Sequence, residues 1–152
     1  MRRLFLLAAF GFVLAGPVFC PAQVKGYWRA ASSNAVSITG DIEISDTKIS
    51  INFNGFTIAN IRSLSAAETS AIFASESSGS ATGNLYRLNV PASRRFLRHN
   101  SLCGSDDVQW MVTSVAERTL YIGFFSGSDT PQFTPEAMAN STDLCGTFTY
   151  VR

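Results

Sequence analysis

The chain has 152 residues, with 12 Lys and Arg, 11 Asp and Glu, one His and a formal net charge of +1. This length supports one domain rather than two, and a charge so close to neutral gives no electrostatic reason to expect nucleic-acid binding. A single histidine excludes a histidine cluster around a catalytic metal. We therefore expect neither a metal nor a cofactor.

Residues 1–22 have the composition of a secretory signal peptide. Arg2 and Arg3 form a short basic start, and a mainly apolar run over Leu4–Val13 follows. That run is shorter than the ~20 apolar residues that a membrane-spanning helix requires. We expect cleavage after Ala22, which leaves residues 23–152 as one secreted domain in the periplasm or outside the cell.

Two other interpretations of this leader remain open. Cleavage after Ala15 or Gly16 is the alternative to cleavage after Ala22. Arg2-Arg3-Leu4-Phe5-Leu6 also resembles the core of a twin-arginine export signal, so the sequence does not decide between the general and the twin-arginine route. No later segment is long and apolar enough to cross a membrane, and we expect no membrane span once the leader is removed.

Cys103 and Cys145 are the cysteines that follow the leader, and each stands in a Leu-Cys-Gly tripeptide. An even pair of cysteines in an exported chain is typical of a disulfide. Such a bond would stabilise the fold by about 4 kcal/mol on the chain-entropy model. Two cysteines and one histidine do not supply the four ligands of a structural zinc site, so we predict a disulfide between Cys103 and Cys145.

Apolar residues alternate with polar ones through the first half of the expected domain, which is the pattern of half-buried strands. It predicts strands over Val36–Ser45, Lys48–Phe53 and Phe56–Ile61. Asn54-Gly55 stands between the last two, and this dipeptide favours a two-residue hairpin turn because both residues tolerate positive φ. The three strands are therefore expected to form a meander.

The middle of the chain is less regular. Ser63–Glu68 is a connector with helical character, and Thr69–Ala74 is expected to be a short strand. Ser75–Gly83 is small and polar, so it is expected to be a loop. A strand over Asn84–Val90 ends before a proline, and Ala92–Cys103 is expected to hold one helical turn.

The last third predicts a hairpin of Val108–Val115 with Thr119–Phe125. Ser126–Thr134 is expected to be a loop. Pro135–Asn140 fits a short helix, with Thr134 as its N-cap and proline at its first position. Gly146–Arg152 is expected to close the chain as a strand.

About eight short strands with short turns predict an all-β fold, a small antiparallel barrel or sandwich with one or two short helical turns. Pairing of the first strand with the last would remove exposed edges from such a sheet. We expect the domain to be a monomer.

The polar residues give no catalytic constellation. His99 stands between Arg98 and Asn100 in an expected loop, so we expect it to be solvated. Asp106 and Asp107 precede a strand, where acidic residues are common in turns. Asp41 and Glu43 fall on the same face of one expected strand, as in a solvated outer face. We therefore expect a protein that is not an enzyme.

Arg94, Arg95 and Arg98 form the one cluster of like charges after the leader, and they are the candidate binding residues. On a helical turn, Arg94 and Arg98 would share a side and could contact an anion or an acidic partner. The alternative is a solvated bend whose Phe96 and Leu97 enter the core.

Gly26-Tyr27-Trp28 resembles the Gly-x-Trp that opens the first strand of lipocalin-like barrels. The resemblance implies a structural Trp28 that plugs the closed end of a barrel. With its leader, its meander and its paired Leu-Cys-Gly, the chain also resembles small exported β-barrel proteins of Gram-negative bacteria, several of which inhibit lysozyme or proteases. Neither resemblance carries a site residue to this chain.

These observations favour a non-enzymatic module that binds another envelope or extracellular protein, with an inhibitor of a lysozyme or a protease as the form that the resemblance implies. Binding on such scaffolds usually resides in loops, which makes Ser75–Gly83 and Ser126–Thr134 the first places to look. The alternative is a lipocalin-like carrier that holds a small apolar ligand inside the barrel.

Overall fold

The computed structural model describes residues 24–73 and 81–152, so the predicted leader and most of the predicted Ser75–Gly83 loop lie outside the described residues. The described strands are β1 (Gly26–Ala30), β2 (Ile42–Ile44), β3 (Lys48–Ile51), β4 (Asn54–Thr57), β5 (Ala59–Leu64), β6 (Gly83–Val90), β7 (Val108–Ala116), β8 (Thr119–Phe125) and β9 (Leu144–Val151). The helices are α1 (Ala66–Phe73) and α2 (Pro135–Ala139), with a π-helical turn η1 (Ala35–Thr39) and a 3-10 turn η2 (Leu97–His99).

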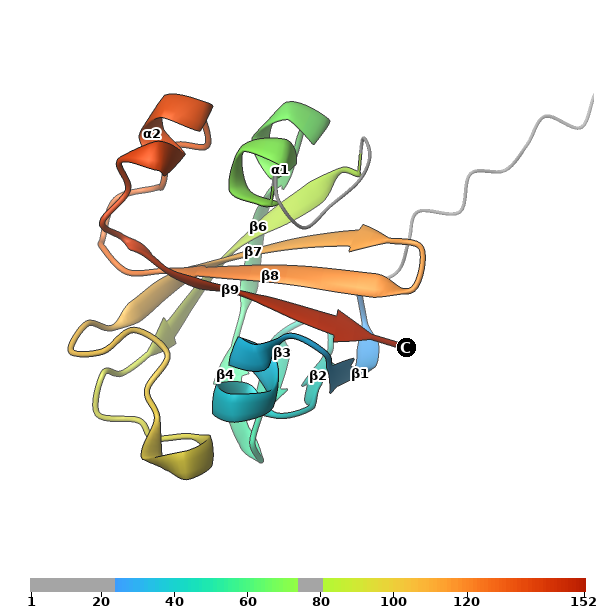
Figure 1. Ribbon diagram of the computed structural model, residues 1–152, viewed down its shortest axis with the longest axis vertical. Coiled ribbons are helices and arrows are strands. Elements are labelled where there is room, and N and C mark those ends of the chain that lie inside the picture. The colour runs from blue at the N-terminus through green and yellow to red at the C-terminus, as the bar shows by residue number, and fades with distance from the viewer. Residues whose placement is uncertain (1–23, 74–80) are drawn as a thin grey trace, which may run out of the picture.

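The strands form one antiparallel sheet in the order β4-β3-β2-β1-β9-β8-β7-β6-β5 (Figure 1). The predicted all-β class is confirmed. The two edge strands, β4 and β5, are consecutive in the chain and are separated by Ile58 alone. The sheet must therefore curl so that its two edges lie next to each other. No ladder of hydrogen bonds joins β4 to β5, and the sheet is therefore not closed into a barrel.

Strand β1 joins the two halves of the sheet. Its residues Gly26–Trp28 pair with β2, whereas Arg29 and Ala30 pair with Val151 and Tyr150 of β9. The predicted pairing of the first strand with the last is confirmed. Since β1 exchanges one partner for the other within five residues, it fixes how the N-terminal strands β1–β4 sit against the C-terminal strands β6–β9.

Apolar side chains from both halves meet in one cluster, which we call the inner core. Burial of each large side chain stabilises the fold by roughly 1.5–3 kcal/mol, so the cluster holds the curled sheet together. Its largest fully buried members are Trp28, Ile42, Ile49, Ile51, Met111, Phe124, Phe148 and Tyr150.

A second cluster, the outer core, covers the opposite face of the C-terminal strands. Helices α1 and α2 lie together on this face (Figure 1). Strands β7 and β8 are consequently buried on both faces, which explains why their sequences are nearly continuous apolar runs. The buried members of the outer core are Leu64, Ile72, Phe73, Leu85, Trp110, Val112, Tyr121, Phe125 and Phe133.

The predicted strand over Val36–Ser45 is wrong in its first half, because Ala35–Thr39 forms the π-helical turn η1. The buried Thr39 hydroxyl bonds to the Ala35 carbonyl at 3.1 Å and lies 2.7 Å from the Tyr150 hydroxyl of β9. Burial raises the pKa of Tyr150, which remains a neutral partner for Thr39. Gly40, with φ +64°, ends the turn in a conformation that glycine adopts freely.

The predicted hairpin turn at Asn54-Gly55 is also wrong. The turn is made by Asn52 and Phe53, whose φ angles are 45° and 64°, and Ile51 pairs with Asn54. The register places buried Ile49 opposite buried Phe56, so inner-core packing sets the turn two residues earlier than the Asn-Gly signal does.

The predicted strand over Thr69–Ala74 is wrong, since residues 69–73 belong to α1. The helix begins with a capping box, in which the Ser65 amide donates to Glu68 Oε2 at 2.9 Å and the Glu68 amide donates to Ser65 Oγ at 3.3 Å. The Ser-x-x-Glu spacing of Ser65 and Glu68 is the sequence signal for this helix start.

Several predictions are confirmed within a residue or two. They include the strand β6, the β7–β8 hairpin, the last strand β9 and the single turn η2. Helix α2 begins as predicted, because the Ala137 amide donates to Thr134 Oγ1 at 3.1 Å and Pro135 occupies the first turn.

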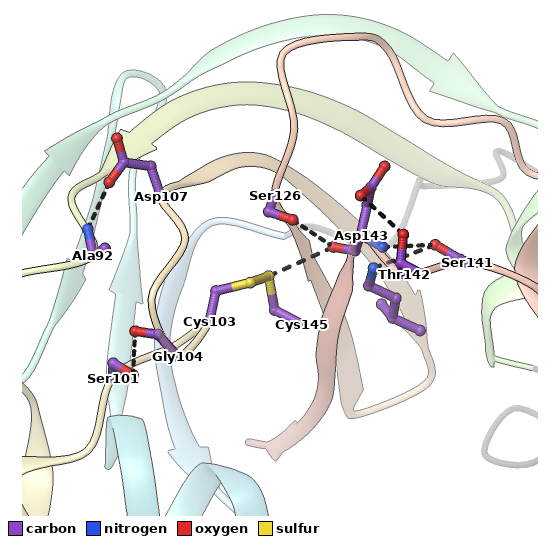
Figure 2. Close-up of a disulfide and its surroundings, with 11 residues drawn as sticks. Ala92, Ser101, Cys103, Gly104, Asp107, Ser126, Ser141, Thr142, Asp143 and Cys145 are labelled. Atoms are coloured by element: carbon purple, nitrogen blue, oxygen red, sulfur yellow. Dashed lines mark hydrogen bonds between the residues drawn. A yellow bond between two sulfur atoms is a disulfide. The ribbon is translucent and has the colours of Figure 1, made fainter.

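The predicted disulfide is present. Cys103 and Cys145 are bonded across a Cα–Cα distance of 4.8 Å, which ties the loop before β7 to the start of β9 (Figure 2). Close by, the Ala92 amide donates to Asp107 Oδ1 at 2.7 Å (Figure 2). The disulfide thus holds the long loop between β6 and β7 against β9, and the Ala92–Asp107 hydrogen bond joins the two ends of that loop.

Reduction of the disulfide should lower the free energy of unfolding by about 2 to 4 kcal/mol, because the released loop regains chain entropy in the unfolded state. Urea unfolding of the oxidised protein, the reduced protein and the Cys103→Ser/Cys145→Ser variant measures this. The reduced protein and the variant should coincide. Identical unfolding midpoints for the oxidised and reduced proteins would contradict the prediction.

Glu68→Gln should destabilise the protein by about 1 kcal/mol near neutral pH, because it weakens the capping box of α1. The Arg62 guanidinium, followed by the Ser65 amide, lowers the pKa of Glu68 from 4.5 to about 2. Stability linked to this carboxylate is present above the unfolded pKa and is lost as the pH falls through the folded value.

The difference in unfolding free energy between wild type and Glu68→Gln should therefore shrink as the pH is lowered from 4.5 toward 2. Urea unfolding at a series of pH values measures it. Glu117→Gln, in the exposed β7–β8 turn, is the matched control. A difference that stayed constant with pH would show that the charge of Glu68 plays no part.

Candidate functional site

The three candidate arginines lie on one exposed loop but not on one helical turn. Arg94 and Arg95 precede η2, and Arg98 lies inside it with φ 55°. Arg94 donates to Asn54 Oδ1 at 3.3 Å, whereas Arg95 donates to the Ala92 carbonyl at 2.6 Å. The predicted shared side of Arg94 and Arg98 is therefore not formed, and Arg94 lies against the β3–β4 hairpin.

Phe96, which lies between Arg95 and Arg98, enters the core, as the alternative of a solvated bend predicted. Phe96 is buried, and its ring lies 6.0 Å from the ring of Phe56. Leu97 packs over Gly40, because a Cβ added to Gly40 would lie only 3.0 Å from Leu97 Cδ1. The loop is thus a solvated bend fixed by Phe96 and Leu97, and it brings Arg94 to the end of the sheet that holds η1 and the hairpin.

Of the other residues considered for chemistry, Asp106, Asp107 and Ser126 line one polar surface pocket, whereas His99 is not part of it. His99 is exposed with φ 62°, and Asp107 holds a turn through Ala92. Ser126 begins the predicted Ser126–Thr134 binding loop, but it is buried. Its amide donates to the Asp143 carbonyl at 2.8 Å, and its hydroxyl donates to the same carbonyl at 3.4 Å (Figure 2). None of these residues forms a catalytic pair with another.

A pocket of about 360 Å³ lies on the outer face of β1–β3, at the same end as Arg94. We call it the Tyr27 pocket. Its lining residues come from four separate segments: Tyr27, Thr39, Gly40, Asp41, Ile42, Glu43, Ser50, Asn52, Phe53 and Leu97. Asp41 and Glu43 are its charged members, so the lining carries two negative charges and no positive one.

Tyr27 and Asp41 form the best-defined contact in this pocket. The Tyr27 hydroxyl donates to Asp41 Oδ2 at 2.5 Å, and the Ala30 amide donates to Asp41 Oδ1 at 2.9 Å. The Tyr27 hydrogen bond first, then that of Ala30 and the charge of Arg29, lower the pKa of Asp41. The same carboxylate raises the pKa of Tyr27, so the pair is held as neutral phenol and ionised carboxylate near pH 7.

Glu43 is the second carboxylate of the pocket and lies directly opposite Tyr27 in the β1–β2 ladder. Its neighbour on the other side is Ser50 of β3. Within residues 24–73 and 81–152, the Glu43 side chain makes no hydrogen bond or ion pair. An exposed carboxylate with free acceptor capacity therefore stands beside the Tyr27 ring, which is 61% exposed.

Phe53 stands at the rim of the pocket, at the tip of the β3–β4 hairpin. Its side chain is fully exposed, at 103% of the reference value. Its φ of 64° lies in the left-handed region, which costs about 1 kcal/mol or more for a residue with a Cβ. Neither the backbone nor core packing explains a phenylalanine here.

A larger, mainly apolar pocket of about 500 Å³ lies between α1 and α2, and no charged side chain of the described residues lines it. No group of three or more His, Cys, Asp or Glu among them could hold a metal ion. In the same part of the chain, no helix has the length and apolar character needed to cross a membrane.

The sequence indicated some members of this pocket but not the pocket itself. Asp41 and Glu43 were expected on one outer face, and the structure places them there. Tyr27 and Phe53 were missed as site residues. The alternation that makes Trp28 buried does predict an outward Tyr27, but its position opposite Glu43 follows only from the β1–β2 register.

Comparisons of the chain with known protein families, with curated proteins and with solved structures gave no match.

Tyr27→Phe should raise the pKa of Asp41 toward its ordinary value, because it removes the largest cause of the shift and leaves the Ala30 hydrogen bond. An NMR pH titration of the Asp41 carboxyl carbon measures it. Folding lowers the pKa of Asp41, so the stability linked to this carboxylate is present above the unfolded pKa and is lost in acid. Any loss of stability in Tyr27→Phe relative to wild type should therefore become smaller as the pH falls. Ser50→Ala, in the same pocket, is the control, and an unchanged Asp41 titration in Tyr27→Phe would contradict the prediction.

Proposed function

We propose that this chain is an exported, non-enzymatic binding module that holds a protein partner through its hairpin end. We define the binding face as Tyr27, Phe53 and Arg94. Aromatic and arginine side chains of this kind dominate the energetics of protein interfaces. The intramolecular disulfide supports a location in the periplasm or outside the cell, where such bonds persist.

The observation that carries the proposal is Phe53. A fully exposed phenylalanine in a left-handed backbone conformation contributes nothing to the core and strains the turn that bears it. Residues held in unfavourable conformations concentrate at sites of function. A hairpin tip also presents its side chain beyond the sheet, where a partner can enclose it.

Arg94 supports the same face from a different segment. Its guanidinium donates to Asn54 Oδ1, so it lies beside the hairpin rather than free in solvent. An arginine that is already oriented loses less conformational entropy on binding than a mobile one. Of the three candidate arginines, we therefore include only Arg94 in the binding face. Arg95 and Arg98 belong to the solvated bend and are not part of it.

The inner core favours binding at the surface over the carrier alternative. A carrier needs an apolar cavity of several hundred Å³ inside the sheet. Here large side chains from both halves, among them Trp28, Phe124 and Tyr150, pack against one another on the inner face. An inhibitor of a lysozyme or a protease remains the specific form of the proposal, because a projecting aromatic side chain suits insertion into a cleft.

Phe53→Gly separates binding from stability. It creates Asn-Gly at the turn, so the free energy of unfolding should rise by about 1 kcal/mol as the left-handed strain is relieved. Affinity for the partner should fall by roughly thirtyfold, as for an interface anchor worth about 2 kcal/mol. Affinity capture from an envelope extract of the source organism, followed by binding and inhibition assays with the captured protein, measures the second effect.

Ile61→Gly is the matched control, because Ile61 is a half-exposed apolar residue on the opposite edge strand β5. It should capture the same protein as wild type. If Phe53→Gly and wild type capture the same proteins with equal affinity, or if no protein is captured and neither lysozyme nor protease activity is inhibited, the proposed function is wrong.

A further inference from the structure

We infer that the Tyr27 pocket receives an arginine side chain of the partner, with the guanidinium between the Tyr27 ring and the Glu43 carboxylate. This inference rests on the proposed function and adds the chemistry by which the partner is recognised. It is carried by the charge of the lining, the open aromatic faces and the unengaged acceptor of Glu43.

Charge complementarity comes first. The residues that line the pocket include two carboxylates and no cation. Asp41 is engaged by Tyr27 and by the Ala30 amide, and the charge of Arg29 acts on it. Glu43 has no such partner among the described residues, so its negative charge is left for a ligand.

The lysine of β3 is directed away from Glu43. Lys48 is on β3, two residues before Ser50, which pairs with Glu43. A Cβ added to Gly55 would come within 2.4 Å of Lys48 Cε, so the Lys48 side chain lies over β4. Because β3 separates β4 from β2, the lysine stem runs away from Glu43.

The aromatic faces are the second reason. The chain stacks arginines on three of its own described rings: Arg62 on Phe133, Arg87 on Trp110 and Arg152 on Trp28. No described arginine or lysine stacks on Tyr27 or Phe53, although both rings are exposed. A cation over such a ring is attracted by its negative face.

Arginine fits this arrangement better than lysine. Its planar guanidinium can lie flat on the Tyr27 ring while its N–H groups donate to a neighbouring carboxylate in a fork. The hydrogen bond from the Tyr27 hydroxyl to Asp41 fixes the ring in place, so the partner's side chain meets a preformed site. Phe53, at the rim, would pack against the apolar stem of the inserted arginine.

The test titrates the oxidised protein with Nα-acetyl-L-arginine methylamide and follows its backbone amides by NMR. The matched probe is the citrulline analogue, which has the same shape without the charge. The arginine probe should shift the amides of Tyr27, Glu43 and Ser50 in a saturable way, and the citrulline probe should not. Raising the salt concentration should weaken the binding, because an exposed ion pair is screened.

Glu43→Gln should weaken binding of the arginine probe about threefold to fivefold, as expected for the loss of one partly exposed ion pair. Glu117→Gln makes the same charge change in the β7–β8 turn and should leave binding unchanged. Equal shifts with the citrulline probe, or full binding by Glu43→Gln, would overturn the inference.

The two proposals fail separately. If capture of a partner depends on Phe53 but the arginine probe does not bind, the binding face stands and the arginine pocket is wrong. If the probe binds as described but no captured protein depends on Phe53, the pocket recognises a guanidinium and the proposed function is wrong.

Discussion

The fold depends on burial of the inner core between the two halves of one curled sheet. Strand β1 makes this possible, because it pairs with β2 through one part of its length and with β9 through the other. Trp28 marks the centre of that strand and is almost completely buried. Its indole nitrogen donates to the Val24 carbonyl at 2.7 Å, and the Arg152 guanidinium lies 3.8 Å from its ring centre. The first and last strands are thereby joined by side chains as well as by their ladder.

The proposed site is built on the reverse side of the same strand. Since successive side chains of a strand point to opposite faces, inward Trp28 requires outward Tyr27. Asp41 bonds to both the Tyr27 hydroxyl and the Ala30 amide, at the point where β1 leaves β2 and turns to β9. The Asp41 carboxylate therefore accepts a backbone hydrogen bond where β1 changes partner, and it also holds the Tyr27 ring in place.

Local patterns predicted the structure well where burial is local and poorly where distant contacts decide. The β7–β8 hairpin and the capped helix α2 follow from neighbouring residues, and both are confirmed. The alternation through Val36–Thr39 is equally real, but Thr39 reaches Tyr150 of the last strand only from a helical turn. Likewise, the pairing of Ile49 with Phe56 places the turn at Asn52-Phe53, although Asn54-Gly55 favours a turn at its own position. In both cases a contact with another strand outweighs a turn or strand preference.

The sequence by itself determined the all-β class, the disulfide between Cys103 and Cys145 and the outward position of Asp41 and Glu43, because each depends on residue type and spacing along one segment. Only the tertiary structure decided that Tyr27 faces Glu43 and that Arg94 lies beside the hairpin. It also decided that Phe53 occupies the tip. The physical reason is register: a strand's pattern states which face a side chain takes, whereas its neighbour across the ladder depends on how the whole sheet packs around its core.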